Sequence, residues 1–187
     1  YNILYLAFYK NDKINLSLEY NIKTEYINNN DKINKIKFNK YDLVILGSGM
    51  EGKLPTASKL HKSIPDLYNK LLKDSNIKIL GICYGMQLLS HYYYNHDVVK
   101  LNNRNKLIMN INLDQRYSIV KNIPNMKVQF NHKYYCPYIT SGIISSIKFN
   151  NVVIPSMIKY TNNHYGVQFH FLNKYDLGKI IKNIIIS

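Results

Sequence analysis

Cys83 stands where a thiol could act as a nucleophile. It lies between Gly81 and Gly85, and the mostly apolar run 77–82 before it has the length of a strand. Apolar side chains in 86–93 then recur at helical spacing. A strand, a tight turn and a helix with the nucleophile at the corner is the arrangement called a nucleophile elbow.

The flanking glycines would let the backbone bend sharply and let a substrate approach closely. A cysteine at the start of a helix also sits in the positive end of the helix dipole, which favours the thiolate. The alternative is an inert, buried cysteine at the end of a strand. The glycines and the switch from strand to helix favour the reactive interpretation.

Two sequence motifs carry a resemblance to a known family. Residues 81–87, Gly-Ile-Cys-Tyr-Gly-Met-Gln, are similar to the G-x-C-x-G-x-Q signature of the class I glutamine amidotransferases. Residues 165–170, Tyr-Gly-Val-Gln-Phe-His, are similar to the family motif that ends in the catalytic histidine. Tyr84 and Met86 make the resemblance strongest to the amidotransferase part of GMP synthase, with the glutaminase of imidazole glycerol phosphate synthase next.

The resemblance implies hydrolysis of L-glutamine through a thioester and transfer of ammonia to a synthetase subunit or domain. It assigns seven residues: Cys83 as nucleophile, His170 as proton carrier, the backbone N–H groups of Gly49 and Tyr84 as oxyanion hole, and Gln87, Asn131 and His132 at the glutamine. This chemistry needs no cofactor. The remaining histidines show no metal-ligand spacing with cysteine or carboxylate, so we expect no metal site.

The chain also departs from the family pattern. Leu172 stands where the family has the glutamate that orients the histidine, and leucine cannot accept a hydrogen bond. Asp176 is the nearest carboxylate downstream. The loop Gly47-Ser48-Gly49-Met50 lacks the family's proline, Tyr134 replaces an aspartate, and Asn95-His96 replaces paired glycines.

These departures leave two other functions open. The chain could be an impaired amidotransferase that acts as a binding or regulatory module, or a related Cys–His hydrolase of another γ-glutamyl substrate. A third hypothesis is polyanion binding, because the formal net charge is +14. The lysines are scattered along the chain, however, which favours solvated faces over a nucleic-acid site.

Composition bounds the class of protein. With 187 residues, 46% of them hydrophobic, the chain suits one globular domain, 1–187. Its two cysteines argue against a disulfide scaffold and for a reducing, cytoplasmic compartment. No apolar run approaches the ~20 residues of a membrane span. The chain does not begin with Met, as expected of a processed or excised piece of a longer protein.

The predicted elements alternate. We expect strands over 2–8, 22–27, 41–46 and 77–82, a helix capped by Ser63, a helix after Cys83, and a last helix over 176–186 capped by Asp176. Residues 12–20 alternate like a strand, whereas the resemblance implies a helix, and 28–31 read as a loop. Short β-rich runs in 106–167 predict added antiparallel strands and hairpins.

The expected fold is therefore α/β, with a mostly parallel sheet flanked by helices and antiparallel additions in the C-terminal half. By resemblance it is of the flavodoxin-like amidotransferase type. Gly49, Cys83 and His170 would all lie at strand ends, and in open α/β sheets ligand sites lie at the carboxyl ends of the strands.

Overall fold

A seven-stranded sheet forms the centre of the molecule. The computed structural model describes residues 1–16, 19–49, 54–137 and 139–187. Within these ranges the large sheet has the order β2-β1-β3-β4-β11-β10-β9. Its strands are β1 (Asn2–Ala7), β2 (Asn21–Tyr26), β3 (Leu43–Leu46), β4 (Ile79–Ile82), β9 (Ile143–Phe149), β10 (Val152–Lys159) and β11 (His164–Val167). The first five strands in this order, β2, β1, β3, β4 and β11, pair in parallel. Strand β10 pairs antiparallel with both β11 and β9. The predicted mixed sheet is confirmed.

Two small sheets lie beside it. One has the order β12-β7-β6, and the other pairs β5 with β8. Their strands are β5 (Val99–Asn105), β6 (Ile108–Asn112), β7 (Asn125–Gln129), β8 (His132–Tyr135) and β12 (His170–Phe171). The prediction of antiparallel strands in 106–167 is therefore confirmed. Only β9 and β10 extend the main sheet, and β11 in this range is parallel to β4.

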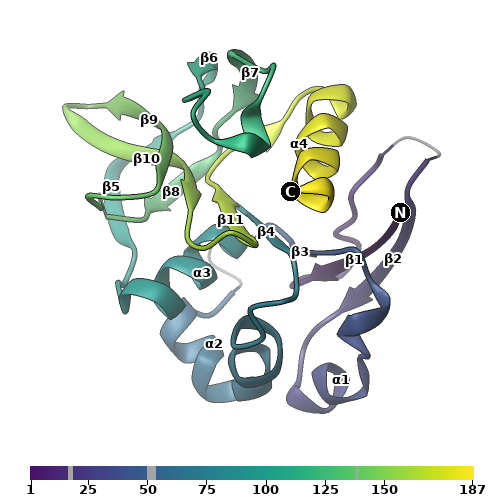
Figure 1. The fold of residues 1–187 in the computed structure, drawn as a ribbon. Helices are drawn as coiled ribbons and strands as arrows, with labels where there is room; N and C mark the ends of the chain where they lie inside the picture. The colour runs from purple at the N-terminus through teal and green to yellow at the C-terminus, as the bar shows by residue number, and fades with distance from the viewer. Residues whose placement is uncertain (17–18, 50–53, 138) are drawn as a thin grey trace.

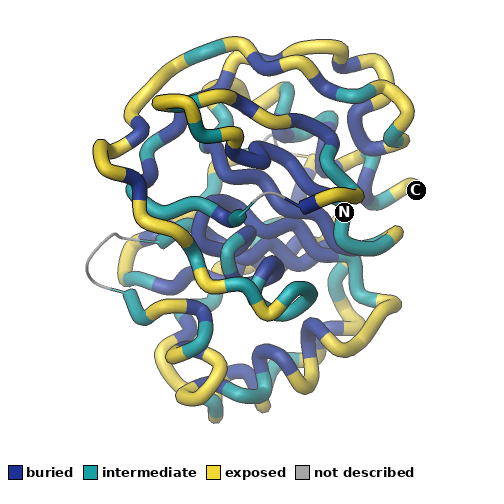
Figure 2. Tube along the Cα trace, turned by 90° about the vertical axis from the view of Figure 1, so that its left-hand side faces the viewer, coloured by how far each residue is buried: buried dark blue, intermediate teal, exposed yellow. Residues whose placement is uncertain are grey.

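Helices cover both faces of the main sheet (Figure 1). They are α1 (Asn30–Lys35), α2 (Ala57–Ser63), α3 (Tyr84–Tyr94), α4 (Lys174–Ile186), the short 3₁₀ helices η1 (Phe38–Lys40) and η3 (Ser118–Val120), and the π-helix η2 (Leu67–Leu72). In Figure 1, α1, α2 and α3 lie below the sheet and α4 lies above it. Figure 2 shows the buried residues concentrated in the layer between them.

The alternation of side chains along β1 explains the two layers. Ile3 and Tyr5 point to the face covered by α4, whereas Leu4 and Leu6 point to the face covered by α2 and α3. All four are almost fully buried. A parallel strand with apolar side chains on both faces must be covered on both faces, which is why the chain alternates strands with helices.

Several predicted boundaries are wrong. Ser63 ends α2 instead of capping a helix, and its Oγ donates to the carbonyl of Leu60 at 3.1 Å. The reason is Pro65, which disfavours helical backbone at the residue before it. Thr56 is the N-cap of α2: its Oγ1 accepts a hydrogen bond from the backbone N–H of Lys59 at 3.4 Å.

The last helix begins earlier than predicted. Asn173 caps α4, its Oδ1 accepting from the N–H of Tyr175 at 2.8 Å, and Asp176 lies in the first turn. The predicted loop 28–31 contains the start of α1, which Asn29 caps. Both asparagines are good N-caps because their side-chain oxygens satisfy N–H groups without helical partners. In 12–20, the described residues form neither the strand nor the helix.

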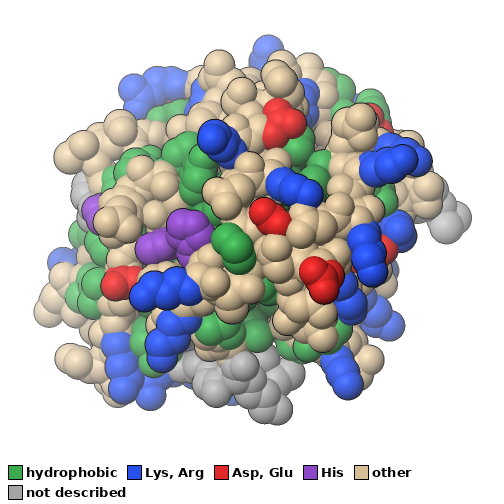
Figure 3. Space-filling view, turned by 90° about the horizontal axis from the view of Figure 1, so that it is seen from below, with side chains coloured by type: hydrophobic (Ala, Val, Ile, Leu, Met, Phe, Trp, Pro, Cys, Tyr) green, Lys and Arg blue, Asp and Glu red, His purple; other side chains and the backbone are tan. Residues whose placement is uncertain are grey.

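On the face seen in Figure 3, charge is not gathered at one place. Figure 3 shows Lys and Arg side chains dispersed over one face, with acidic side chains among them. Among the described residues, none of the helices is both long enough and apolar enough to cross a membrane.

Candidate active site

Cys83 occupies the corner between β4 and α3. Its backbone has φ 53° and ψ −99°, a conformation that non-glycine residues rarely adopt. Hydrogen bonds on both sides hold the corner: the N–H of Cys83 donates to the carbonyl of Val167 at 2.7 Å, and that of Gly85 donates to Gly47 at 3.1 Å. The elbow is thus tied to the carboxyl ends of both neighbouring strands, β3 and β11.

The sulfur of Cys83 is buried, and three donors point at it. Burial raises the pKa of the thiol to about 11, although the backbone N–H groups of Tyr84 and Gly49 and the side chain of Gln168 act to lower this pKa. Nε2 of Gln168 lies 3.6 Å from Sγ. The N–H groups at the start of the helix favour the thiolate, as expected, but desolvation outweighs these donors and the net pKa is raised.

Alkylation of Cys83 by iodoacetamide should reveal this raised pKa. Only the thiolate reacts, so the rate should rise about tenfold per pH unit beyond pH 9 and level off near pH 11. An ordinary cysteine levels off at about pH 9. Mass spectrometry of the peptide that contains Cys83 would follow the rate separately from Cys136. A plateau at pH 9 or below would contradict the burial argument.

The thiol opens into a cavity of about 390 Å³. That volume lies in the range of small-molecule sites. All seven residues expected at the site line this cavity: Gly49, Cys83, Tyr84, Gln87, Asn131, His132 and His170. They come from the ends of β3 and β4, from α3, and from the segments around β8 and β12. Their roles stay predictions, but the fold places them together.

Hydrogen bonds fix the polar side chains on the far wall of the cavity. Nε2 of Gln87 donates to the carbonyl of Tyr134 at 3.4 Å, which links α3 to β8. Oδ1 of Asn131 accepts from Nε of Arg104 at 2.8 Å. These two bonds connect α3 to β8, and β5 to the residue just before β8, around the cavity.

His132 is a buried, neutral histidine, only 4% exposed. Its Nδ1 donates to the carbonyl of Tyr134 at 2.9 Å, and its Nε2 accepts from Nδ2 of Asn105 at 3.1 Å. Burial lowers the pKa of His132 to about 4. The residue therefore holds β8 in the cavity wall and does not lie on the surface.

The buried His132 should make stability depend on pH. In the unfolded chain the imidazole takes up a proton near pH 6.5, whereas in the folded protein it does so only near pH 4. Stability from this group is therefore complete above pH 6.5 and is lost as the pH falls from 6.5 to 4, by about 3 kcal/mol in total. Urea unfolding followed by circular dichroism should show a smaller loss in His132→Gln than in the wild type. Equal pH slopes in the two proteins would contradict this prediction, and His96→Gln is the matched control.

His170 begins β12, directly after the turn that follows β11. Burial lowers the pKa of its imidazole. Within the described part of the chain, its ring makes no hydrogen bond to Cys83 or to a carboxylate. Leu172, at the position of the family's glutamate, is 45% exposed. Asp176 does not line the cavity that holds Cys83.

Three residues of the site escaped the sequence analysis. Arg104 lines the cavity, and its charge acts to lower the pKa of Cys83. Tyr9 lines it from the segment after β1. Gln168 lies within a recognised motif, but its approach to the sulfur depends on the turn between β11 and β12. Arg104 could have been noticed as one of few arginines, whereas Tyr9 is one of 18 tyrosines. In the described residues, no group of three or more His, Cys, Asp or Glu side chains could hold a metal ion.

Comparison with known proteins gives one family. Residues 7–171 match the family described as Glutamine amidotransferase class-I. The chain is similar to the glutamine-hydrolysing GMP synthase of Acetivibrio thermocellus, with 29% identity over 153 residues, and to that of Mesoplasma florum, with 31% over 160 residues. Each match covers 81% of this chain but only 28% of the relative.

Solved structures agree on the fold. A putative GMP synthase subunit from Thermoplasma acidophilum superposes with a TM-score of 0.67 at 16% identity, covering 99% of this chain and 94% of that one. A glutamine amidotransferase from Thermotoga maritima gives 0.67 at 16%, covering 97% and 80%. The matched family residues, the elbow at Cys83 and this fold lead to one conclusion: the chain belongs to the class-I glutamine amidotransferases.

Proposed function

We propose that this chain hydrolyses the side-chain amide of L-glutamine and supplies the ammonia to a synthetase of GMP-synthase type. The observation that carries the proposal is the surroundings of the Cys83 sulfur. Two backbone N–H groups, of Gly49 and Tyr84, point at it, and the thiol shares one cavity with His170. A nucleophile, a base and two aligned donors are what acyl transfer from an amide needs.

The positive charge of the cavity suits the α-carboxylate of an amino acid. Arg104 and Lys133 line it, and among its described lining residues there is no aspartate or glutamate. We place the α-carboxylate of glutamine toward Arg104 and Asn131 and its side-chain amide toward Cys83. Gln87 and His132 then form the wall along which the substrate lies.

In the first half of the reaction, His170 takes the proton of the Cys83 thiol as the sulfur attacks the amide carbon. The carbonyl oxygen becomes an oxyanion held by the N–H groups of Gly49 and Tyr84, each worth about 3 kcal/mol of barrier. When the tetrahedral intermediate collapses, the C–N bond breaks. His170 returns its proton to the leaving nitrogen, so that ammonia departs and a thioester remains.

In the second half, water replaces ammonia. His170 takes a proton from the water as its oxygen attacks the thioester carbon, and the same two N–H groups hold the second oxyanion. The C–S bond then breaks, glutamate leaves, and the proton returns from His170 to the sulfur of Cys83. One glutamine and one water give one glutamate and one ammonia.

The relatives support the proposed partner. Those named above are GMP synthases about three to four times as long as the matched segment, since the match covers 28% of each. We infer that 1–187 forms one amidotransferase domain and that the ammonia acceptor lies outside these residues.

Ammonia release from L-glutamine tests the proposal. We expect release by the purified chain, alone or with the ATP-pyrophosphatase part of a GMP synthase, to fall at least about 10³-fold in Cys83→Ala. The matched control is Cys136→Ala, which changes the other buried cysteine and should keep the activity. Release that does not depend on Cys83, or no release from folded protein in either setting, would refute the proposal.

One observation favours a second candidate, a module that binds glutamine without turnover. Among the described residues, no carboxylate is hydrogen-bonded to His170, and the side chain of Leu172, at the position of the family's glutamate, is 45% exposed. Such a protein would gain thermal stability with glutamine but release no ammonia. The activity measurement above decides between the two.

A further inference from the structure

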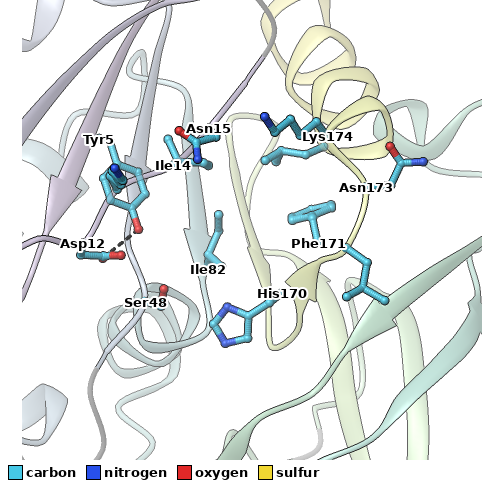
Figure 4. Close-up of a pocket in the computed structure, with 13 residues that line it drawn as sticks. Tyr5, Asp12, Ile14, Asn15, Ser48, Ile82, His170, Phe171, Asn173 and Lys174 are labelled. Atoms are coloured by element: carbon cyan, nitrogen blue, oxygen red, sulfur yellow. Dashed lines mark hydrogen bonds between the residues drawn. The ribbon is translucent and has the colours of Figure 1, made fainter.

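A second cavity lies beside His170. Its volume is about 290 Å³. It shares His170 and Ser48 with the cavity that holds Cys83, so the imidazole separates the two spaces. Figure 4 shows His170 at one end of this second cavity, Asn15 and Lys174 at the other, and Phe171 opposite Tyr5 and Asp12.

Among the described residues that line this cavity, no carboxylate is hydrogen-bonded to His170. Leu172 lines the cavity but cannot accept a hydrogen bond. Asp12 is the one carboxylate among the described lining residues, and its Oδ2 accepts from the hydroxyl of Tyr5 at 2.8 Å. Tyr9 also hydrogen-bonds to Asp12. The carboxylate of Asp12 is therefore engaged by two tyrosines, away from the imidazole.

The remaining polar groups would favour an anion. Lys13 and Lys174 both line the cavity, and the first turn of the 13-residue helix α4 adjoins it at Lys174. Asp12 is the only opposing charge among the described lining residues, and the hydroxyl of Tyr5 donates to its carboxylate. An imidazolium, formed at His170 during turnover, would add a further positive charge at the other end.

A histidine that shuttles protons works best when an acceptor holds its second nitrogen, as the serine-protease triad illustrates. Here neither Leu172 nor Asp12 fills this role, and the cavity beside the ring is lined by two lysines. We propose that this cavity binds a carboxylate from outside the chain, which accepts a hydrogen bond from His170 and orients the imidazole toward Cys83. The inference rests on the proposed function.

Two sources can present this group: a free small carboxylate, or the side chain of an aspartate or glutamate on a docked synthetase. Acetate is the probe for both. We expect acetate, titrated against chloride at constant ionic strength and pH 8, to raise kcat for glutamine hydrolysis saturably by at least about tenfold. KM for glutamine should stay within about twofold, because the carboxylate acts from the opposite side of the ring.

Leu172→Glu supplies the carboxylate from within the chain. This variant should hydrolyse glutamine faster than the wild type without acetate and should no longer respond to it. Leu172→Met, of similar size and without an oxygen that could accept from His170, should keep the acetate response. Asp12→Asn should keep the acetate response as well, because Asp12 accepts from Tyr5 and not from His170.

A measurement without turnover completes the test. In an NMR titration, acetate should raise the pKa of His170 in the wild type, since a nearby carboxylate stabilises the imidazolium, but not in Leu172→Glu. If acetate changes neither kcat nor this titration while Leu172→Glu is active, the inference is overturned and the proposed function stands. If neither the wild type nor Leu172→Glu releases ammonia, alone or with the ATP-pyrophosphatase part of a GMP synthase, the proposed function itself fails.

The source is settled by adding the ATP-pyrophosphatase part of a GMP synthase. If that part activates the chain and abolishes the acetate response, the docked chain supplies the carboxylate. If acetate still activates the complex, the ligand is a free carboxylate. Loss of activity in Asp12→Asn together with no acetate response would show an internal acid and overturn the inference.

Discussion

Replacing His170 by glutamine should lower kcat for glutamine hydrolysis at pH 8 by about 10³-fold, with little change in KM. The reason is the high pKa of the nucleophile. Burial holds the pKa of Cys83 at about 11, so the thiol is not ionised at pH 8 and needs a base to attack. Two histidines line the cavity that holds the sulfur. Both ring nitrogens of His132 are hydrogen-bonded, whereas among the described residues the ring of His170 has no such partner, so His170 can take the proton.

The pH profiles of the two proteins should differ in a defined way. The pKa of His170 is lowered by burial, so the imidazole is neutral at pH 7, and wild-type activity should fall only as the pH drops below 6.5. In His170→Gln the remaining rate should keep rising up to pH 10, as the thiolate itself forms. Ammonia release measured from pH 5 to 10 checks both curves.

His96→Gln is the control, because His96 lines neither cavity. It should keep the wild-type rate and profile. Retention of more than a tenth of the activity in His170→Gln would show that another group takes the thiol proton.

Replacing Gly85 by alanine should destabilise the fold by about 3 kcal/mol or more. Gly85 is the second residue of α3, where the helix passes directly over β3. A Cβ at Gly85 would collide with the carbonyl oxygen of Leu46 and would lie 2.8 Å from its carbonyl carbon. Backbone, not a mobile side chain, forms this contact, so relief requires moving α3 away from the sheet. That movement would also displace Cys83, and catalysis should fall with stability.

Gly178→Ala is the matched control for this prediction. Gly178 lies inside α4, and a Cβ there would meet only Tyr20, at 3.7 Å. Alanine in a helix interior is favoured over glycine by about 0.5–1 kcal/mol, so this variant should be slightly more stable than the wild type. Urea unfolding of both variants measures the two effects. A Gly85→Ala protein as stable as the wild type would contradict the close approach of α3 to β3.

The sequence by itself determined the local framework of the site. Apolar runs of strand length, the helical spacing after Cys83 and the glycines around it predicted β4, the turn and α3. These features are local, because strand and helix periods and glycine conformations depend on neighbouring residues. The ends of helices were predicted less well: Ser63 and Asp176 are plausible caps, but Pro65 and Asn173 decide where α2 ends and α4 begins.

Only the tertiary structure decided the chemistry around those residues. The raised pKa of Cys83 results from burial in the folded chain, which no local pattern records. Arg104, Tyr9 and Gln168 reach the site from distant segments. The cavity beside His170 likewise joins residues from segments far apart in the chain, such as Asp12, Ile82 and Leu172. Desolvation and long-range contacts depend on which segments pack together, so they are properties of the folded chain.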